Sequence, residues 1–345
     1  MNSFRIVLRL TFLAIFVLSL EPIVAQDRYR IMFYNVENLF DPFNDSLKND
    51  DEFTPQGSRF WTWRRMNEKL NNIYRVITAV GEWDPPTMVG FCEIENRFVM
   101  DRLTKHTPLS KYNYQLVHRE SPDARGIDVA LIYRPDQFTV EEERFFRVTY
   151  PDNPDRATRD VLYARGLLDN RDTLHVFVNH WPSKFGGALA SEPGRIAAGK
   201  VVREKIDSIR IFYPDARIIV MGDFNDTPSS KPLVDGLKAS PPTPPLNSNG
   251  LYNLHHPFEA RGEGTLKFQG AWEVIDMMIV SKSLLNRKHG VYTTPDGGKI
   301  FMADFLLEED DRFVGVRPFR TYIGFRYHGG YSDHLPIYID LFPNR

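Results

Sequence analysis

Short apolar runs bounded by turn residues recur along the chain, and each predicts a buried β-strand. In the segment IIVMGDFNDTP (residues 218–228), four apolar residues are followed almost at once by Asp223, Asn225 and Asp226. Such a run therefore predicts a core strand that ends in a group of polar side chains. The predicted strands occupy residues 30–36, 87–94, 114–119, 128–134, 174–180, 216–222, 274–281 and 335–342.

Apolar residues at helical spacing predict two helices between these strands. The first stripe, with intervals of four, three, four and three, consists of Met66, Leu70, Ile73, Ile77 and Val80. The second, less regular stripe consists of Ile196, Val202, Ile206 and Ile209. Because strands and helices mix without strict alternation, the pattern favours an α/β sandwich, with two sheets back to back and helices outside.

The N-terminal segment predicts a secretory signal peptide over residues 1–25, followed by a single domain over residues 26–345. Arg5 and Arg9 precede an apolar run at residues 10–20 that is short for a membrane span. An uncleaved anchor is the alternative, but an acidic residue and a proline directly after the run disfavour it. No later stretch approaches a membrane span, so we expect a secreted or periplasmic protein without stable membrane insertion after cleavage.

The balance of charges and the single cysteine limit the partners and the chemistry that this protein can have. The 345 residues include 43 Lys and Arg against 45 Asp and Glu, so any contact with a polyanion must be local. The single cysteine, Cys92, cannot form an intrachain disulfide bond. It lies within an apolar strand pattern, where an inert buried thiol is more common than a nucleophile.

Polar residues stand at one end of six predicted strands. Taken singly, most of them are explained by turns and caps. Asp276 differs because it lies inside an apolar run, where an unpartnered polar group costs about 2–7 kcal/mol. The polar residues are Asn35, Glu37, Glu93, Glu95, Asn179, His180, Asp223, Asn225, Asp276, Ser332, Asp333 and His334.

If these strands end at the same edge of the sandwich, the polar residues form one cleft rich in carboxylates. Neighbouring carboxylates repel one another unless a cation is present. Oxygen ligands with few Cys or His favour Mg²⁺, with Mn²⁺ or Ca²⁺ as alternatives, over Zn²⁺. A metal, a polarised base and hydrogen-bond donors together suit in-line attack of water on a phosphoester.

The motifs YNVENLFD, FCEIEN, NHWPSK, GDFNDTP, VIDMMIVS and YSDHLP occur in this order between residues 30 and 341. They resemble the successive motifs of the endonuclease/exonuclease/phosphatase superfamily, also called DNase I-like, and particularly its secreted bacterial members. GDFND followed about 110 residues later by SDHLP is a specific pair, whereas either motif alone would be weak evidence. The resemblance implies a four-layered α/β sandwich, with two central mixed β-sheets flanked by helices, and metal-dependent hydrolysis of phosphoester bonds.

The resemblance also implies a metal side of the cleft. Glu93 would be the principal ligand, with Asn35 and Glu37 nearby through side chain or water. Asp333 would complete this side. Many relatives carry Gln where this chain has Cys92, which removes one polar contact beside Glu93.

The same resemblance implies the groups that act on the phosphate. Asp223 would position or activate the attacking water, and Asn225 would hold a phosphate oxygen. His334 would pair with Asp276 and contact the phosphoryl group, while His180 would be the second histidine and would stabilise the leaving or equatorial oxygen. Either Asp223 or the Asp276–His334 pair can be the base in this scheme.

Three functions fit these residues. The first is a secreted metal-dependent phosphodiesterase or nuclease, and the second is hydrolysis of a small or lipid phosphate, such as an inositol phosphate or a phosphosphingolipid. The third is a non-catalytic binding protein on the same scaffold. The sequence leaves the oligomeric state open. Candidate phosphate contacts are Arg59, Arg64 and Arg65 around Trp61 and Trp63, with Arg125, Tyr133, Lys184, Arg195, Arg317 and Arg320 elsewhere.

Overall fold

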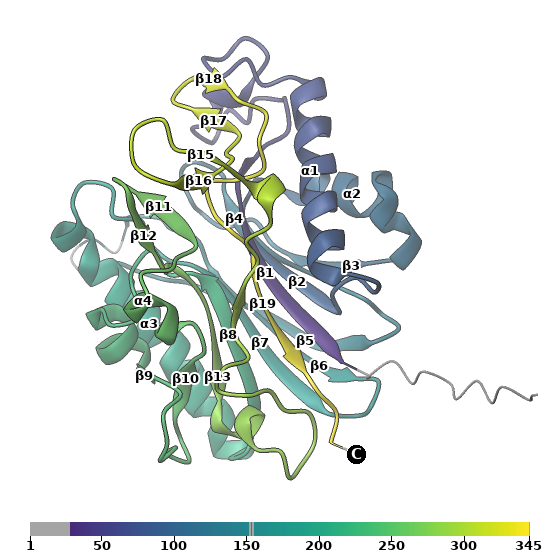
Figure 1. Cartoon of the computed structure of the whole chain (residues 1–345), viewed down its shortest axis with the longest axis vertical. Coiled ribbons are helices and arrows are strands. Elements are labelled where there is room, and N and C mark those ends of the chain that lie inside the picture. Colours follow the sequence, from purple (N-terminus) through teal and green to yellow (C-terminus); the bar gives the residue numbers. More distant parts are fainter. Residues whose placement is uncertain (1–27, 152, 154, 345) are drawn as a thin grey trace, which may run out of the picture.

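Two large β-sheets face one another, and helices cover their outer faces (Figure 1). The computed structural model describes residues 28–344 except 152 and 154. The predicted signal peptide lies outside these residues. Within the described residues, no helix combines the length and apolarity needed to cross a bilayer.

The first sheet has six strands and is mixed. β1 pairs in parallel with β2, whereas its other neighbour, β19, is antiparallel. Since β4 is antiparallel to β2, its first residue lies beside the last residue of β2. In spatial order the strands are β14 (Lys299–Ile300), β19 (Ile337–Leu341), β1 (Tyr29–Leu39), β2 (Met88–Ile94), β4 (Asp128–Tyr133) and β3 (Gln115–His118).

The second sheet has seven strands and is also mixed. β7 and β8 are parallel, and β13 is antiparallel to β8, with Asp276 directly opposite Asp223. In spatial order the strands are β5 (Phe138–Phe146), β6 (Val161–Leu168), β7 (Thr173–His180), β8 (Arg217–Asp223), β13 (Asp276–Ser281), β10 (Leu251–Asn253) and β9 (Ala239–Ser240).

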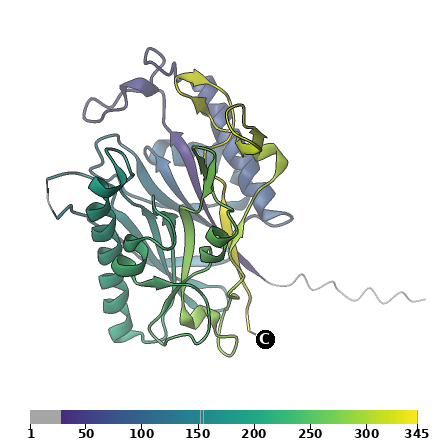
Figure 2. The same ribbon diagram turned by 60° about the vertical axis from the view of Figure 1, so that its left-hand side comes forward.

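Helices complete the four layers. α1 (Trp63–Gly81) and α2 (Arg97–His106) pack on the first sheet, and α3 (Ala188–Phe212) packs on the second. Figure 2 shows α3 on one side of the sheets and α1 on the other. The remaining elements are short: η1 (Asp51–Phe53), η2 (Pro108–Tyr112), η3 (Pro232–Leu237), α4 (His256–Ala260), η4 (Lys282–Leu285), η5 (Asp304–Leu306), and the hairpins β11 (Leu266–Phe268) with β12 (Ala271–Glu273), β15 (Leu307–Glu309) with β16 (Val316–Pro318), and β17 (Tyr322–Ile323) with β18 (Arg326–Tyr327).

The strands alternate between two apolar cores, as the period of two along a strand requires. Phe33 of β1 and Met221 of β8 lie in the inner core between the sheets. Tyr34 instead packs in the outer core with α1 and α2, and Val220 packs in the other outer core with α3. The predicted four-layered sandwich is therefore confirmed, and each predicted strand and helix has its counterpart in the structure.

The two tryptophans before and within α1 differ in their environment. Trp61 is fully buried, and its indole Nε1–H donates to the carbonyl of Phe40 at 2.8 Å. Trp63 is 42% exposed and makes edge contacts with Phe43 and Phe98. Trp61 thus holds the start of α1 against the core, which is the structural alternative to stacking on nucleic acid bases.

Candidate active site

The backbone departs from regular strand geometry where the polar residues of the first sheet begin. One β-bulge follows Asn35 in β1, and another lies between Cys92 and Ile94 in β2. Inside these bulges Glu37 and Glu93 adopt left-handed φ angles of 51° and 59°. Such backbone costs non-glycine residues about 1–2 kcal/mol and clusters at functional sites. The bulges re-aim the two carboxylates toward the end of the sandwich.

A buried ion pair joins the two sheets at this end. His334, three residues before β19, places its Nδ1 2.7 Å from Oδ2 of Asp276, the first residue of β13. Burial alone would lower the pKa of His334, but the charge of Asp276 and its hydrogen bond outweigh burial and raise the pKa well above its usual range. The imidazole is therefore a cation at neutral pH.

Asp223 lies between this imidazolium and the first sheet. Its Oδ2 accepts a hydrogen bond from Nδ2 of Asn35 at 3.0 Å and lies 3.9 Å from Nε2 of His334. Its Oδ1 accepts from the backbone N–H of Asn225 at 2.8 Å. Burial, with a further contribution from the charge of Asp276, raises the pKa of Asp223 to about 7. A carboxyl group in this range is suited to exchange a proton at neutral pH.

Glu93 lies at the mouth of the cluster. Its Oε2 accepts from the backbone N–H of Asn38 at 3.0 Å, and its Oε1 lies 3.5 Å from Nδ2 of Asn35. Asn35 thus presents its amide nitrogen to the carboxylates, while its oxygen accepts from the backbone of Glu37 at 3.0 Å. No Lys or Arg among the described residues forms an ion pair with Glu93, whose side chain is 16% exposed.

His180 is the second imidazole of the cluster. Its Nε2 lies 3.7 Å from Oδ2 of Asp223 and 4.0 Å from Oε1 of Glu93. Burial, together with the positive charges of Arg159 and Arg125, lowers the pKa of His180 well below its usual range. The ring is therefore neutral, in contrast to His334.

Two further predicted residues, Glu37 and Asp333, form ion pairs with Arg320. Arg320 donates from Nε to Glu37 Oε1 at 3.2 Å and from Nη2 to Asp333 Oδ2 at 2.7 Å. The backbone N–H of Thr321 also donates to Glu37, at 2.6 Å. Burial would raise the pKa of Asp333, but the positive charge of Arg320 prevails and lowers it. Arg320 thus compensates two of the carboxylates that sequence reasoning assigned to the metal.

Lys69 of α1 is a buried residue that sequence reasoning missed. Its ammonium group donates to the carbonyl of Tyr331 at 2.8 Å and to the hydroxyl of Thr321. Burial lowers the pKa of Lys69 to about 8. A signal was available, since Lys69 stands three residues after Met66 and four before Ile73, on the apolar face of the helix.

Sequence comparison identifies the family. The profile of the Endonuclease/Exonuclease/phosphatase family matches residues 30–342. The chain belongs to this family. A search of curated protein sequences gave no match.

Solved structures of the endonuclease/exonuclease/phosphatase superfamily share the fold. The catalytic domain of human Nocturnin is 17% identical, with 92% of this chain and 94% of that chain covered and a TM-score of 0.55. A mannosyl-6-phosphatase from Bacteroides thetaiotaomicron is 16% identical, with coverage of 91% and 99% and a TM-score of 0.54. A humanized D. rerio TDP2 is 15% identical, with coverage of 91% and 98% and a TM-score of 0.54.

The donor set of the cluster fits the divalent metals that this family generally uses. Carboxylate oxygens of Asp223 and Asp276 lie within 4.8 Å of each other and of a ring nitrogen of His334, which as an imidazolium is not itself a ligand. Glu93 adds a carboxylate with no ion pair to Lys or Arg in the described chain. Hard oxygen donors of this kind suit Mg²⁺, Mn²⁺ or Ca²⁺. Arg320 forms ion pairs with Glu37 and Asp333, whereas Glu93 is left available to a metal ion.

Arg125 and Tyr133, the two residues predicted to contact phosphate near β4, lie at opposite ends of that strand. Arg125 is half exposed and lies close enough to His180 to lower the pKa of that imidazole. Tyr133 ends β4 and pairs with Met88 at the start of β2. It therefore lies at the opposite end of the sheet from Glu93, and its predicted contact with the reacting phosphate is wrong.

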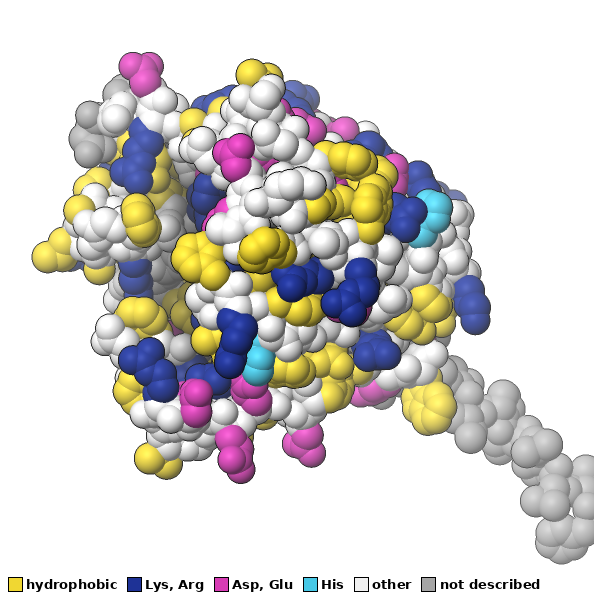
Figure 3. Space-filling view, turned by 90° about the horizontal axis from the view of Figure 1, so that it is seen from above, with side chains coloured by type: hydrophobic (Ala, Val, Ile, Leu, Met, Phe, Trp, Pro, Cys, Tyr) yellow, Lys and Arg dark blue, Asp and Glu magenta, His cyan; other side chains and the backbone are white. Residues whose placement is uncertain are grey.

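Most of the other candidate phosphate contacts are already engaged within the protein. Arg195 is buried and donates to Asp226 at 2.8 Å, and Arg317 donates to Glu308 at 2.8 Å. Seen from the end at which β1 finishes, Lys and Arg side chains lie scattered among hydrophobic ones, without a continuous basic band (Figure 3). Few of the predicted basic contacts are thus unengaged, although the side chain of Arg64 is 78% exposed and lies 4.0 Å from Glu68.

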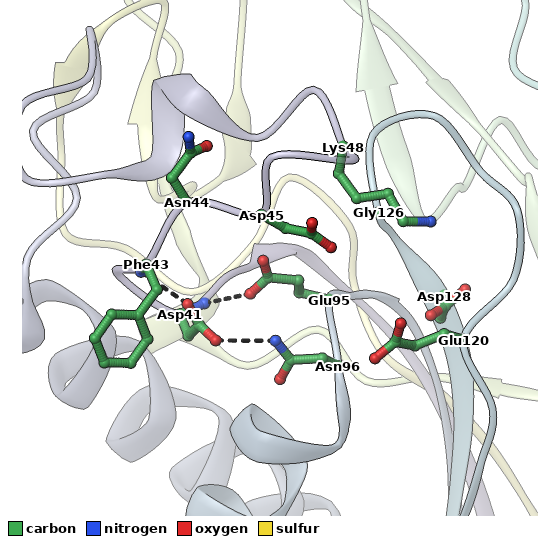
Figure 4. A pocket seen from close by; sticks show the side chains of 10 residues that line it. All are labelled: Asp41, Phe43, Asn44, Asp45, Lys48, Glu95, Asn96, Glu120, Gly126 and Asp128. Atoms are coloured by element: carbon green, nitrogen blue, oxygen red, sulfur yellow. Dashed lines mark hydrogen bonds between the residues drawn. The ribbon is translucent and has the colours of Figure 1, made fainter.

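An acidic hollow lies beside the metal side of the cleft, between the segments that follow β1 and precede β4. It encloses about 110 Å³, and Figure 4 shows carboxylate groups around it. Glu95 accepts from the backbone N–H of Asp41 at 2.6 Å, and burial, with the nearby charges of Asp41 and Asp50, raises the pKa of Glu95 to about 9. The carboxylates that line it are those of Asp41, Asp45, Glu95, Glu120 and Asp128.

Proposed function

We propose that the protein is a divalent-metal-dependent phosphoester hydrolase in which Asp223 accepts the proton of the attacking water. The observation that carries the proposal is the pairing of opposite charges across one edge of the sandwich. A buried imidazolium, His334, held at 2.7 Å by Asp276, lies 3.9 Å from a carboxyl group whose pKa is about 7. A proton acceptor and a fixed positive charge are the two groups that water attack on phosphate requires.

The protonation states support Asp223 rather than the Asp276–His334 pair as the base. His334 is already protonated because Asp276 stabilises its charge, so it has no free lone pair with which to accept a proton. It can donate from Nε2 to a phosphoryl oxygen and stabilise the charge that develops there. Asp223, with a pKa near neutrality, is available for the proton of the water.

The remaining residues orient the reacting groups. Asn35 donates to Asp223 and fixes the direction of its carboxylate. Asn225 donates through its backbone to Asp223 and through its side chain to the carbonyl of Trp181. The neutral His180 faces the same carboxylate and can contact a phosphate oxygen. Glu93 would hold the metal ion, which when bound supplies positive charge to the phosphoryl oxygens.

A small phosphoester is the substrate class that these observations favour over the nuclease reading, which the sequence alone placed first. The engaged arginines supply few free phosphate contacts for a long polyanion. Apart from Lys48 and from Glu95, whose pKa of about 9 keeps it protonated at neutral pH, the charged groups that line the hollow are carboxylates, so it would disfavour further phosphates and suits hydroxyl or cationic groups. One structural neighbour is a mannosyl-6-phosphatase, which supplies a first candidate, mannose 6-phosphate. The signal peptide expected at the N-terminus supports the proposal that the protein is exported and meets this substrate outside the cytoplasm.

Substitution of Glu93 by Gln tests the metal-dependent reaction. The variant is expected to lose hydrolysis and Mn²⁺ binding measured by calorimetry, and to keep its urea midpoint. Glu204→Gln, at an exposed position of α3, is the matched control and is expected to change neither activity nor Mn²⁺ binding. Full activity of the Glu93 variant would remove the proposed metal site.

A substrate screen with Mg²⁺, Mn²⁺ and Ca²⁺ tests the class of phosphoester. Sugar and inositol phosphates, bis(p-nitrophenyl) phosphate, phospholipids, RNA and plasmid DNA cover the alternatives. Turnover of the small esters without cleavage of plasmid supports the proposal, whereas cleavage of plasmid alone would favour the nuclease. Metal binding without turnover of any compound would favour a binding protein on the same scaffold.

A further inference from the structure

The single thiol of the chain lies directly beneath the candidate active site. Cys92 is fully buried in the inner core and immediately precedes Glu93 in β2. One ligand atom each of Cys92, His180 and Asp223 lies within 4.8 Å of the other two. The hydrolytic reaction proposed above makes no use of the thiol, so its place in this cluster needs a separate account.

His180 independently indicates that a ligand binds in this cluster. Its side chain is almost completely buried and makes no hydrogen bond to any other described residue. Nδ1 is buried without a partner, and Nε2 faces Asp223 at 3.7 Å. At 3.7 Å the contact between Nε2 and Asp223 is too long for a hydrogen bond, so the protein leaves this nitrogen free to coordinate a cation.

The three side chains match one class of cation. Sulfur and imidazole donors select zinc and other soft or borderline metals, whereas Mg²⁺ takes oxygen donors. With bond lengths of about 2.0–2.3 Å, a tetrahedral zinc ion places its ligand atoms about 3.3–3.7 Å apart. His180 and Asp223 already meet this spacing, and the thiol would need to approach by at most about 1.5 Å.

We propose that Cys92, His180 and Asp223 form a second cation site, selective for Zn²⁺ or Cd²⁺, that excludes hydrolysis when it is filled. The thiol loses its proton to solvent as the metal–sulfur bond forms. Inhibition rests on the proposed function, because the site takes Asp223 and His180 away from the phosphoester. Binding of the cation does not depend on that function.

A cadmium titration of the full chain tests the site directly. A cadmium–thiolate bond gives an ultraviolet charge-transfer band, and with one cysteine in the sequence the band has a single source. The wild type is expected to show this band with one Cd²⁺ per chain. Cys92→Ala is expected to lose the band, and His180→Ala to weaken Cd²⁺ binding by at least about 100-fold, as loss of a direct ligand should exceed loss of an outer partner. Cys92→Ser serves as a second variant if the alanine variant does not fold.

Zn²⁺ inhibition at saturating Mg²⁺ is the second measurement. The Zn²⁺ concentration for half inhibition is expected to rise at least about 100-fold in Cys92→Ala, relative to that variant's own zinc-free rate. His289→Ala, at an exposed position, is the matched control and should be inhibited like the wild type.

Two results would overturn the proposal: no cadmium band in the folded wild type, or equal Zn²⁺ inhibition of wild type and both Cys92 variants. A cadmium band in a protein that hydrolyses no phosphoester would support the site and remove only the proposed function.

Discussion

Replacing Asp223 with Asn is expected to stabilise the metal-free protein at neutral pH while abolishing hydrolysis. The carboxyl group is buried beside Asp276, and burial raises its pKa from 3.8 to about 7. Between these values the folded state keeps a proton that the unfolded state releases. The free energy of unfolding of the wild type therefore falls as the pH rises through this window.

The size of the effect follows from the same two values. The interval from 3.8 to about 7 corresponds to about 4 kcal/mol at 1.36 kcal/mol per pH unit, of which about 3 kcal/mol falls between pH 4 and pH 7. The amide introduced by Asp223→Asn would not titrate, so the stability of this variant relative to wild type should grow by that amount over this range. Bound Mg²⁺ should reduce the difference because it favours the ionised carboxylate of the wild type.

Urea unfolding with EDTA at several pH values, followed by tryptophan fluorescence, measures this difference. Asp207→Asn is the control, because Asp207, whose side chain is 52% exposed, pairs with Arg203 on α3 and should contribute at most about 1 kcal/mol. A stability difference between the Asp223 variant and wild type that stays constant from pH 4 to pH 7 would refute the reasoning. Asp223 would then lose its support as the proton acceptor.

Three further predictions concern the ion pair, the core and the buried lysine. Asp276→Asn is expected to lower kcat by about 10²–10⁴-fold and to lower the pKa of His334 measured by NMR; an unchanged histidine titration would contradict this. Trp61→Ala removes a buried indole and its hydrogen bond to Phe40 and should cost about 3–5 kcal/mol in urea unfolding, so a loss below about 1 kcal/mol would be inconsistent with its packing. Burial lowers the pKa of Lys69 from 10.5 to about 8, so the free energy of unfolding of the wild type should rise by about 3 kcal/mol from pH 8 to pH 10.5. Lys69→Met should abolish that rise in urea unfolding. The same rise in the variant would exclude Lys69 as its source.

The sequence predicted the fold where apolar residues report directly on burial. The inner strands appear as apolar runs because both of their faces are covered. β5 escaped prediction since it is an edge strand in which three successive glutamates, Glu141 to Glu143, obscure the period of two. α2 is short and carries only a few buried residues, so its apolar stripe is brief.

The site was predictable only in part, for a different reason. Carboxylates and imidazoles at strand ends can be recognised in the sequence by residue type. The structure brings Asn35, Glu93 and His334 together with their predicted partners. Arg320 could not be assigned to Glu37 in this way, because it lies in the short connection between β16 and β17 and their contact joins residues 283 positions apart. Tyr133 failed because residue type alone does not say at which end of a strand a side chain lies.

The hydrogen bonds from Asn35 to Asp223 and from His334 to Asp276 each cross from the first sheet to the second. The alignment of these four side chains therefore depends on the distance between the two sheets, which the apolar side chains packed between them determine. Met221 lies so close to Gly90 that even an added Cβ would approach its Cε to 2.8 Å. In the proposed reaction, turnover would therefore depend in part on side chains that no substrate touches, and both sheets would be needed to assemble the candidate active site.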